Sequence, residues 1–383
     1  MTWNWQQPDW PNFSWNTARF VKAEALFLVE SGEFSGIVKH LSREDHDLVA
    51  VEAMSTEAIT TSEIEGEILN RDSVQSSIRR QLGLSTDRRK AGPAEQGIAE
   101  VMVDLHHSFA EPLSADTLFK WHRLLMSGRT DVGDPGHYRT HAEPMQVVSG
   151  AIYAPKIHFE APPSADVPGE MTRFLNWFQR TAPNGIEPLP ALTRAAVAHL
   201  YFVSIHPFED GNGRICRAIG EKALAQSIGR PTLTALAATI LAKRKGYYDA
   251  LEANNKRNEI TDWIAWFAAA AIEAQRRAIA SVDFLIDKTR LLDRINPVIN
   301  ERQRKALLRM LQEGSEGFKG GLTAGKYTSI TGSSPATATR DLADLVEKNA
   351  LVRAGERRHT HYALAIPLHP VAPVMIDAKG DVE

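Results

Sequence analysis

The chain has very little cysteine: Cys216 is the only one among 383 residues. A single cysteine excludes an internal disulfide framework of the kind that stabilises small secreted domains. No run of about 18 apolar residues is present, and the N-terminus lacks the features of a signal peptide. Net charge is also small, at −3, so no overall field favours nucleic acid or anionic membrane. We therefore expect a cytoplasmic protein with no membrane partner.

The length is sufficient for two or three domains, and changes in composition indicate where they divide. Residues 1–15 hold four of the eight tryptophans, which favours a segment packed on the body of the protein over a partner-recruiting site. A charged linker at 85–93 and Pro297 mark boundaries. We expect an aromatic and helical region at 1–90, a helical core at 91–296, a small domain at 297–366 and a poorly ordered tail at 367–383.

One stretch, IHPFEDGNGRICR at 205–217, concentrates groups that bind phosphate. Helical periodicity stops at Pro207 and resumes at about Gly213, so the stretch is a loop leading into a helix N-terminus. The helix dipole and the free first-turn N–H groups favour an anion there, and glycines allow close approach. Arg214 and Arg217 lie three residues apart and share one face of the first turn. Together these features indicate a polyphosphate site.

Two further side chains in the same stretch suit catalysis. Asp210 offers a hard oxygen ligand of the type that Mg²⁺ uses when it also binds phosphates. His206 offers a base that can be neutral near pH 7. The alternative is a glycine-rich turn with surface arginines and a histidine of structural use only.

The segment HPFEDGNGRICR resembles the Fic signature, H-x-F-x-[DE]-G-N-G-R-x-x-R, at every defined position. The resemblance implies a mainly α fold, in which a Fic-type helical bundle carries a small β-hairpin flap. It also implies transfer of AMP from ATP to a Tyr, Ser or Thr hydroxyl of a target protein, or of the chain itself. His206 would then take the hydroxyl proton and Asp210 would hold Mg²⁺. The nucleotide would be bound by Asp210, Gly211, Asn212, Gly213, Arg214 and Arg217.

A second motif lies at the end of a helix that begins near Ser42, where the sequence reads TSEIEG at 61–66. Gly66 suits the left-handed end of a helix, and Glu65 taken alone is a solvated surface glutamate. However, TSEIEG resembles the Fic inhibitory motif, [ST]-x-x-x-E-[GN]. The resemblance implies that Glu65 is inhibitory, pairs with Arg217 and prevents productive binding of the γ-phosphate.

Two more segments resemble parts of Fic proteins. Residues 146–159 alternate as in a β-hairpin with Ser149 and Gly150 near its bend, and they resemble the flap that clamps a target by strand addition. Tyr248 and Asn255 lie two turns apart on one helical face. An aromatic side chain packed on the bundle is the alternative, but the resemblance implies an adenine site. The flap positions that would dock the target are Val147, Val148, Ser149 and Gly150.

The C-terminal part has a different pattern, with three helices at 301–312, 323–330 and 334–349 followed by two β-like runs. This order resembles a winged helix-turn-helix domain. Residues 301–362 hold 11 Lys and Arg against 7 Asp and Glu, so DNA is a candidate partner, and protein docking or a homodimer are others. The alternatives to AMP transfer are a DNA-binding regulator with a nucleotide-sensing Fic core and a de-AMPylase.

Overall fold

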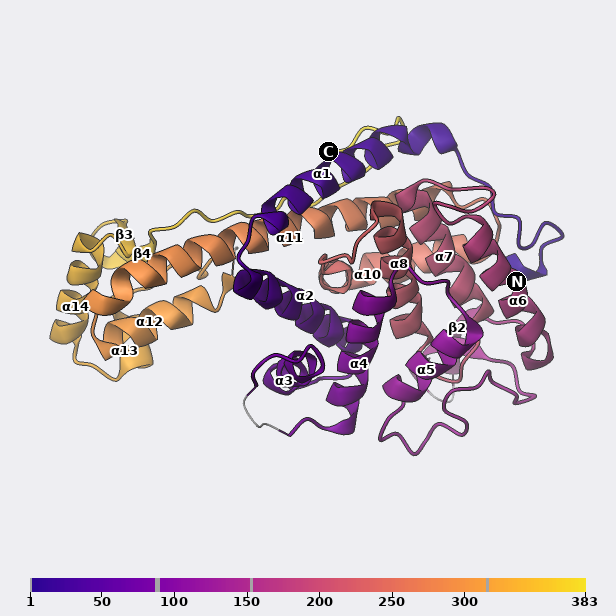
Figure 1. The fold of residues 1–383 in the computed structure, drawn as a ribbon, viewed down its shortest axis with the longest axis horizontal. Coiled ribbons are helices and arrows are strands. Elements are labelled where there is room, and N and C mark those ends of the chain that lie inside the picture. Colours follow the sequence, from indigo (N-terminus) through magenta and orange to yellow (C-terminus); the bar gives the residue numbers. More distant parts are fainter. Residues whose placement is uncertain (1, 87–89, 152–153, 315–316) are drawn as a thin grey trace. The chain divides into compact units, whose positions relative to one another are not determined.

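The computed structural model describes residues 2–86, 90–151, 154–314 and 317–383 (Figure 1). The fold is mainly α, as the sequence predicts, with two small antiparallel hairpins. The chain forms two compact units, Met1–Gln275 with Pro373–Glu383 and Arg276–Ala372, and the first division falls within helix α11 (Thr261–Ile295). Within the described ranges, no helix combines the length and the apolar character needed to cross a membrane.

The first unit begins with two 3₁₀ turns, η1 (Asn4–Gln6) and η2 (Thr17–Phe20), and the helices α1 (Val21–Lys39), α2 (Arg43–Ile64) and α3 (Arg71–Gln81). Ser42 caps α2, because its Oγ accepts from the Asp45 N–H at 3.1 Å. Helix α1 continues through Gly32 and Gly36, although glycine disfavours a helix interior. Buried Phe27 and Phe34 on α1 offset the cost of helical glycine, about 1 kcal/mol each.

The bundle core of the first unit is built from α4 (Pro93–Ser108), α5 (Ala115–Leu125), α6 (Val167–Arg180), α7 (Ala191–Ile205), α8 (Asn212–Ile228), α9 (Leu236–Ala242) and α10 (Arg244–Asn254). Helix α7 is buried along almost its whole length and packs against α8. Buried Glu24 of α1 caps α7, accepting from the backbone N–H groups of Leu192 at 3.0 Å and Thr193 at 2.8 Å. The helices on both sides of the 205–217 loop are therefore fixed by packing.

The N-terminal aromatic segment packs on this bundle. Trp3 lies edge to face against Phe159 at 5.4 Å between ring centroids, and Trp10 against Tyr201 at 5.2 Å. The Trp5 indole N–H donates to the Glu160 carbonyl at 2.6 Å. The segment thus supports the flap strand that contains Phe159 and ends at Glu160.

The flap is an antiparallel hairpin of β1 (Gln146–Ala151) and β2 (Ala154–Glu160). Its register runs from Gln146 opposite Glu160 to Ala151 opposite Ala154, with an irregularity between Val147 and Val148. Ser149 and Gly150, expected near the bend, lie near the end of β1, opposite Lys156 and Pro155, and the connection falls on residues outside the described ranges.

The second unit contains η4 (Asn296–Val298), α12 (Glu301–Leu311), α13 (Ala324–Thr331), α14 (Pro335–Glu347), β3 (Leu351–Ala354), η6 (Arg357–His359) and β4 (His361–Leu364). Its core includes Leu307, Tyr327 and Leu342, all fully buried. Three helices followed by an antiparallel hairpin match the predicted order of elements. The winged-helix assignment and DNA binding stay predictions.

The C-terminal segment corrects one expectation. Residues Pro373–Glu383, predicted to belong to a poorly ordered tail, are part of the first unit. Arg19 donates from Nε to the Asp377 carbonyl at 2.8 Å, and the Val374 N–H donates to Glu273 Oε2 at 2.9 Å. Val374 and Ile376 are buried, so apolar burial holds a segment that has no helical or strand periodicity.

Candidate functional site

His206 lies at the C-terminus of α7, where its backbone is left-handed with a φ of 52°. The imidazole Nδ1 is 3.4 Å from the Val203 carbonyl oxygen, which favours the tautomer with the proton on Nδ1 and Nε2 free to accept one. Burial lowers the pKa of His206 to about 4. His206 is therefore neutral at pH 7 and has the protonation state of a general base.

The loop after His206 is held by its own side chains. Phe208 donates its N–H to Asn212 Oδ1 at 3.0 Å, and Asn212 Nδ2 donates to the Phe208 carbonyl at 2.8 Å. The Phe208 ring stacks on His122 at 4.2 Å between centroids. Gly211 has a φ of 80°, a conformation that glycine adopts without strain. Both amide atoms of Asn212, a predicted nucleotide ligand, are thus engaged inside the loop.

The Glu65 carboxylate, at the end of α2, lies against the first turn of α8. A Cβ placed on Gly213 would lie 2.1 Å from Glu65 Oε1, so only glycine allows this approach. The position is the helix N-terminus, where the dipole and free N–H groups favour an anion. Glu65 therefore lies where the sequence predicts phosphate.

Arg217 is 1% exposed and contacts the C-terminal end of α2. Its Nη2 donates to Glu65 Oε1 at 2.7 Å and to the Thr61 carbonyl at 2.9 Å, and its Nε donates to Thr61 Oγ1 at 2.7 Å. The Nη1 atom makes no hydrogen bond to the part of the chain that the structure describes. The ion pair that the sequence predicts between Glu65 and Arg217 is present.

A second ion pair was not anticipated from the sequence. Arg214, 5% exposed, donates from Nη1 to Glu67 Oε2 at 2.6 Å. Gly66, with a φ of 86°, turns the chain between the two glutamates, so that Glu65 and Glu67 contact arginines one turn apart on α8. The only sequence signal was a second carboxylate two residues after Glu65, directly after the TSEIEG segment.

Asp210 also has an unanticipated partner. Arg129 donates from Nη1 to Asp210 Oδ2 at 2.9 Å and makes two hydrogen bonds to Asp131. The hydrogen bonds from Arg129 lower the pKa of Asp131 to about 2. In the described ranges, no group of three or more His, Cys, Asp or Glu side chains could hold a metal ion. A lone carboxylate fits Mg²⁺ only when phosphate oxygens and water complete the shell.

A cavity of about 570 Å³ opens beside His206. Its walls include Glu65, Gly213, Tyr248 and Asn255, and three predicted flap residues, Val147, Val148 and Ser149; Gly150 is not on the wall. Tyr248 is 40% exposed on α10, while Asn255 is 7% exposed. Asn255 Nδ2 donates to the His158 carbonyl at 3.0 Å, and its Oδ1 has no hydrogen bond within the described chain. That oxygen is an unused acceptor with almost no exposed surface, so a nucleobase N–H could reach it only after a local rearrangement.

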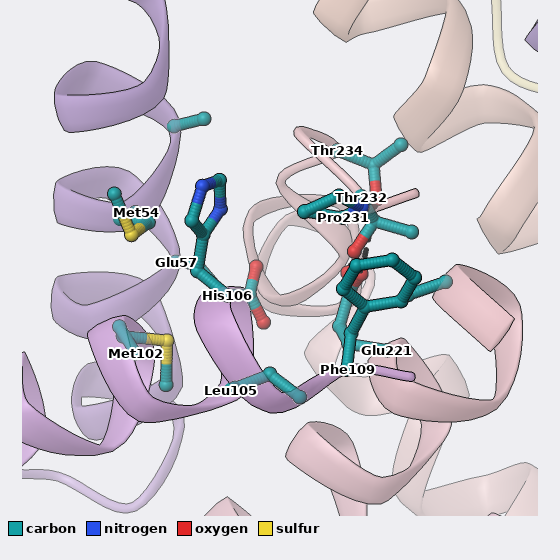
Figure 2. A pocket seen from close by; sticks show the side chains of 12 residues that line it. Met54, Glu57, Met102, Leu105, His106, Phe109, Glu221, Pro231, Thr232 and Thr234 are labelled. Atoms are coloured by element: carbon teal, nitrogen blue, oxygen red, sulfur yellow. Dashed lines mark hydrogen bonds between the residues drawn. The ribbon is translucent and has the colours of Figure 1, made fainter. Parts of the chain in front are cut away.

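A second, much smaller cavity of about 30 Å³ lies between α2, α4 and α8 (Figure 2). Its size is that of about one water molecule, so it does not fit a nucleotide. Glu57 of α2 accepts from the Ala237 N–H at 2.8 Å, and Glu221 of α8 accepts from the Thr234 hydroxyl at 3.1 Å. Burial raises the pKa of both carboxyls, that of Glu221 to about 7.

Cys216 packs inside the bundle. Burial raises the pKa of its thiol to about 12, although Arg217 nearby acts in the opposite direction. The Cys216 thiol donates to the Gly213 carbonyl at 3.0 Å. Its role is therefore packing within α8.

Comparison with family models gives two matches, and both lie within the first unit. Residues 3–84 match a domain of unknown function (DUF4172), and residues 112–224 match the Fic/DOC family. A uridine 5'-monophosphate transferase of Xanthomonas campestris pv. campestris (strain 8004) is 30% identical over 148 residues, 37% of this chain. The match spans about a quarter of that relative, 26% of its length.

Two solved structures are similar to parts of this chain. A Fic domain containing signaling protein from Bacteroides thetaiotaomicron VPI-5482 has a TM-score of 0.50 and 18% identity, over 68% of this chain and 97% of that one. A Fic family protein from Desulfovibrio desulfuricans G20 has a TM-score of 0.49 and 20% identity, over 89% of this chain and 95% of that one. The family match at 112–224 includes His206, Asp210 and Arg217. Residues 112–224 of this chain are thus similar to the Fic/DOC family over the loop and the helix start that form the site.

Proposed function

We propose that the chain is an autoinhibited, Mg²⁺-dependent nucleotidyltransferase that moves AMP from ATP to a Tyr, Ser or Thr hydroxyl of a target protein. The observation that carries the proposal is a neutral His206 on the wall of a nucleotide-sized cavity, beside the N-terminus of α8. A general base, an anion site and a pocket for a nucleobase ring thus lie together. The Fic/DOC match over the same residues supports this assignment.

In this reaction His206 Nε2 takes the proton from the target hydroxyl. The hydroxyl oxygen forms a bond to the α-phosphorus, and the bond from that phosphorus to the bridging oxygen breaks, so that diphosphate leaves. Gly213, Arg214 and Arg217 bind the phosphates through backbone N–H groups and guanidinium forks. A Mg²⁺ ion held by Asp210 would neutralise phosphate charge when bound, and Arg129 would first have to release Asp210.

Inhibition follows from the contacts of the α2 end. Arg217 cannot bind a γ-phosphate in the same geometry while Nη2 donates to Glu65 and Thr61. The Glu65 carboxylate also adds negative charge at the first turn of α8, where the phosphates would bind. The chain as found here should therefore transfer nucleotide slowly.

A second candidate function is transfer of UMP, which the name of the Xanthomonas relative favours. The Asn255 Oδ1 acceptor does not discriminate between the bases, because adenine offers its exocyclic amine and uracil its ring N–H, and a local rearrangement must expose it to either. The half-exposed Tyr248 ring can stack on either. Competition between nucleotides distinguishes the two candidates.

The test is transfer of label from α-labelled ATP or UTP to proteins of a cell lysate and to the chain itself. We expect Glu65→Gly to label with ATP more strongly than with UTP, and His206→Ala or chelation of Mg²⁺ to abolish labelling. Stronger labelling with UTP would replace AMP by UMP. Absence of labelling with both nucleotides in Glu65→Gly, with the fold intact, would refute nucleotidyl transfer.

A further inference from the structure

The geometry points to Arg139 as a positioning residue for His206 and for the flap, a role that rests on the proposed function. Arg139 precedes the flap in the chain and is 3% exposed. Its guanidinium donates from Nε to the His206 carbonyl at 2.8 Å and from Nη2 to the Ile205 carbonyl at 3.4 Å. Its backbone N–H donates to the Pro207 carbonyl at 2.9 Å. Three successive carbonyls around the base are thus bound to one residue.

The other side of the same guanidinium binds the segment that follows the flap. Nη1 donates to Ser164 Oγ at 2.8 Å, and Nη2 donates to the Pro162 carbonyl at 2.5 Å. Residues 162–164 come directly after β2, and Arg139 itself comes shortly before β1. Arg139 therefore connects both ends of the flap to the loop of His206, so that a target held by the flap is in register with the base.

The His206 backbone needs such support. A left-handed conformation costs a residue other than glycine about 1 kcal/mol or more, and it persists only where neighbouring groups hold it. The carbonyl oxygens on both sides of this residue are held by Arg139. Loss of these donors would let the imidazole move, and a shift of about 1 Å at a reacting group can reduce a rate by about 100-fold.

The charge of Arg139 is also better explained by function than by stability. Its hydrogen-bond acceptors in the described chain are all neutral oxygens, and burial lowers the pKa of the guanidinium to about 10. A buried cation without a carboxylate partner is costly to fold. Its positive charge lies close to the base: burial is the main cause of the low His206 pKa, and Arg139 lowers it further, whereas Glu65 and Asp210 raise it. Arg139 thus adds to the effect of burial on the pKa of the imidazole, besides holding its backbone in place.

The experiment compares Arg139→Gln, which removes the charge and most donors, with Arg139→Lys, which keeps the charge, both in the Glu65→Gly background. The matched control is Arg194→Gln, because Arg194 is also buried and donates to the Phe178 and Ala223 carbonyls. Thermal melting, the KM for ATP, kcat and its pH dependence are measured for each. The His206 imidazole is also titrated by NMR in Arg139→Gln and Arg139→Lys that keep Glu65, and its resonance is assigned with His206→Ala.

We expect Arg139→Gln to lower kcat about 10- to 100-fold with a nearly unchanged KM for ATP. The His206 titration and the acid limb of the pH profile should move to higher pH in Arg139→Gln but not in Arg139→Lys, which should recover part of kcat. Equal losses of kcat in Arg139→Gln and Arg194→Gln, or a His206 titration that does not move, would overturn the inference. If Arg139→Gln does not fold, full kcat in Arg139→Lys would overturn the geometric part. If the parent labels nothing, the proposed function fails, and the NMR titration alone decides the role of Arg139.

Discussion

Removing the Glu65 carboxylate should activate the enzyme, and the structure allows an estimate of how much. The hydrogen bond from Arg217 Nη2 to Glu65 Oε1 is 2.7 Å, with side-chain exposures of 1% and 31%. A charge-assisted hydrogen bond contributes about 1.5–3 kcal/mol, and the partial exposure of Glu65 places it toward the lower end. Because about 1.4 kcal/mol corresponds to a factor of ten, Glu65→Gly should raise the transfer rate about 10- to 100-fold.

The assay is the initial rate of label transfer from ATP at a concentration below KM, where release of Arg217 for the γ-phosphate has its full effect. The matched control is Glu63→Gly, because Glu63 is an exposed glutamate near the end of the same helix. Its substitution weakens the helix end without removing a contact to Arg217. Equal rates for the unaltered chain and Glu65→Gly would refute autoinhibition. Equal activation by Glu63→Gly would assign the effect to loosening of α2 instead.

Two other predictions concern the carboxylates of Glu67 and Glu221. Glu67→Gln in the Glu65→Gly background should raise kcat/KM for ATP a further roughly 3- to 10-fold. The reason is that Arg214 no longer has to break an ion pair worth about one kcal/mol before it binds phosphate. An unchanged kcat/KM would show that the Glu67 contact does not affect phosphate binding. Glu221→Gln should raise the Tm at pH 8 by roughly 2–4 °C and leave it unchanged at pH 4. The folded-state pKa of Glu221 is raised to about 7 from 4.5, so the native state holds a proton that the unfolded chain loses, and stability falls as pH rises between these values. Equal shifts in Tm at both pH values would contradict this linkage.

Elements that are determined by their own residues could be predicted from local sequence patterns. The loop at 205–217 has its glycines, histidine and arginines in one short stretch, and the end of α2 is signalled by Gly66. The pairing of Glu65 with Arg217 could be predicted only from the family resemblance, because the two motifs that carry these residues lie far apart in the chain. Tyr248 on α10 and Asn255, the first residue after that helix, line one cavity, although the sequence places both on a single helical face.

Contacts between distant segments without a motif could not be predicted. Arg129 reaches Asp210 and Arg139 reaches His206 only after folding brings the α5–β1 connection against the α7–α8 loop. No periodicity or spacing marks either arginine. The continuation of α1 through Gly32 and Gly36 has a similar cause, because burial of Phe27 and Phe34 outweighs local helix propensity. Tertiary contacts decided each of these cases.

In the proposed mechanism, release of inhibition needs only a local change, and this follows from the groups that each contact holds. Asn212 and Arg139 hold the loop and His206 without any contribution from α2. The end of α2, by contrast, provides the partners of both arginines and the carboxylate over Gly213. A movement of residues 61–67 alone would therefore free the phosphate site while the base and the flap keep their places. Because glycine at 66 tolerates many backbone conformations, the chain can turn there without refolding the bundle. Activation should thus be governed by the free energy of two ion pairs and the Thr61 contacts, and any signal that binds this short segment could supply it.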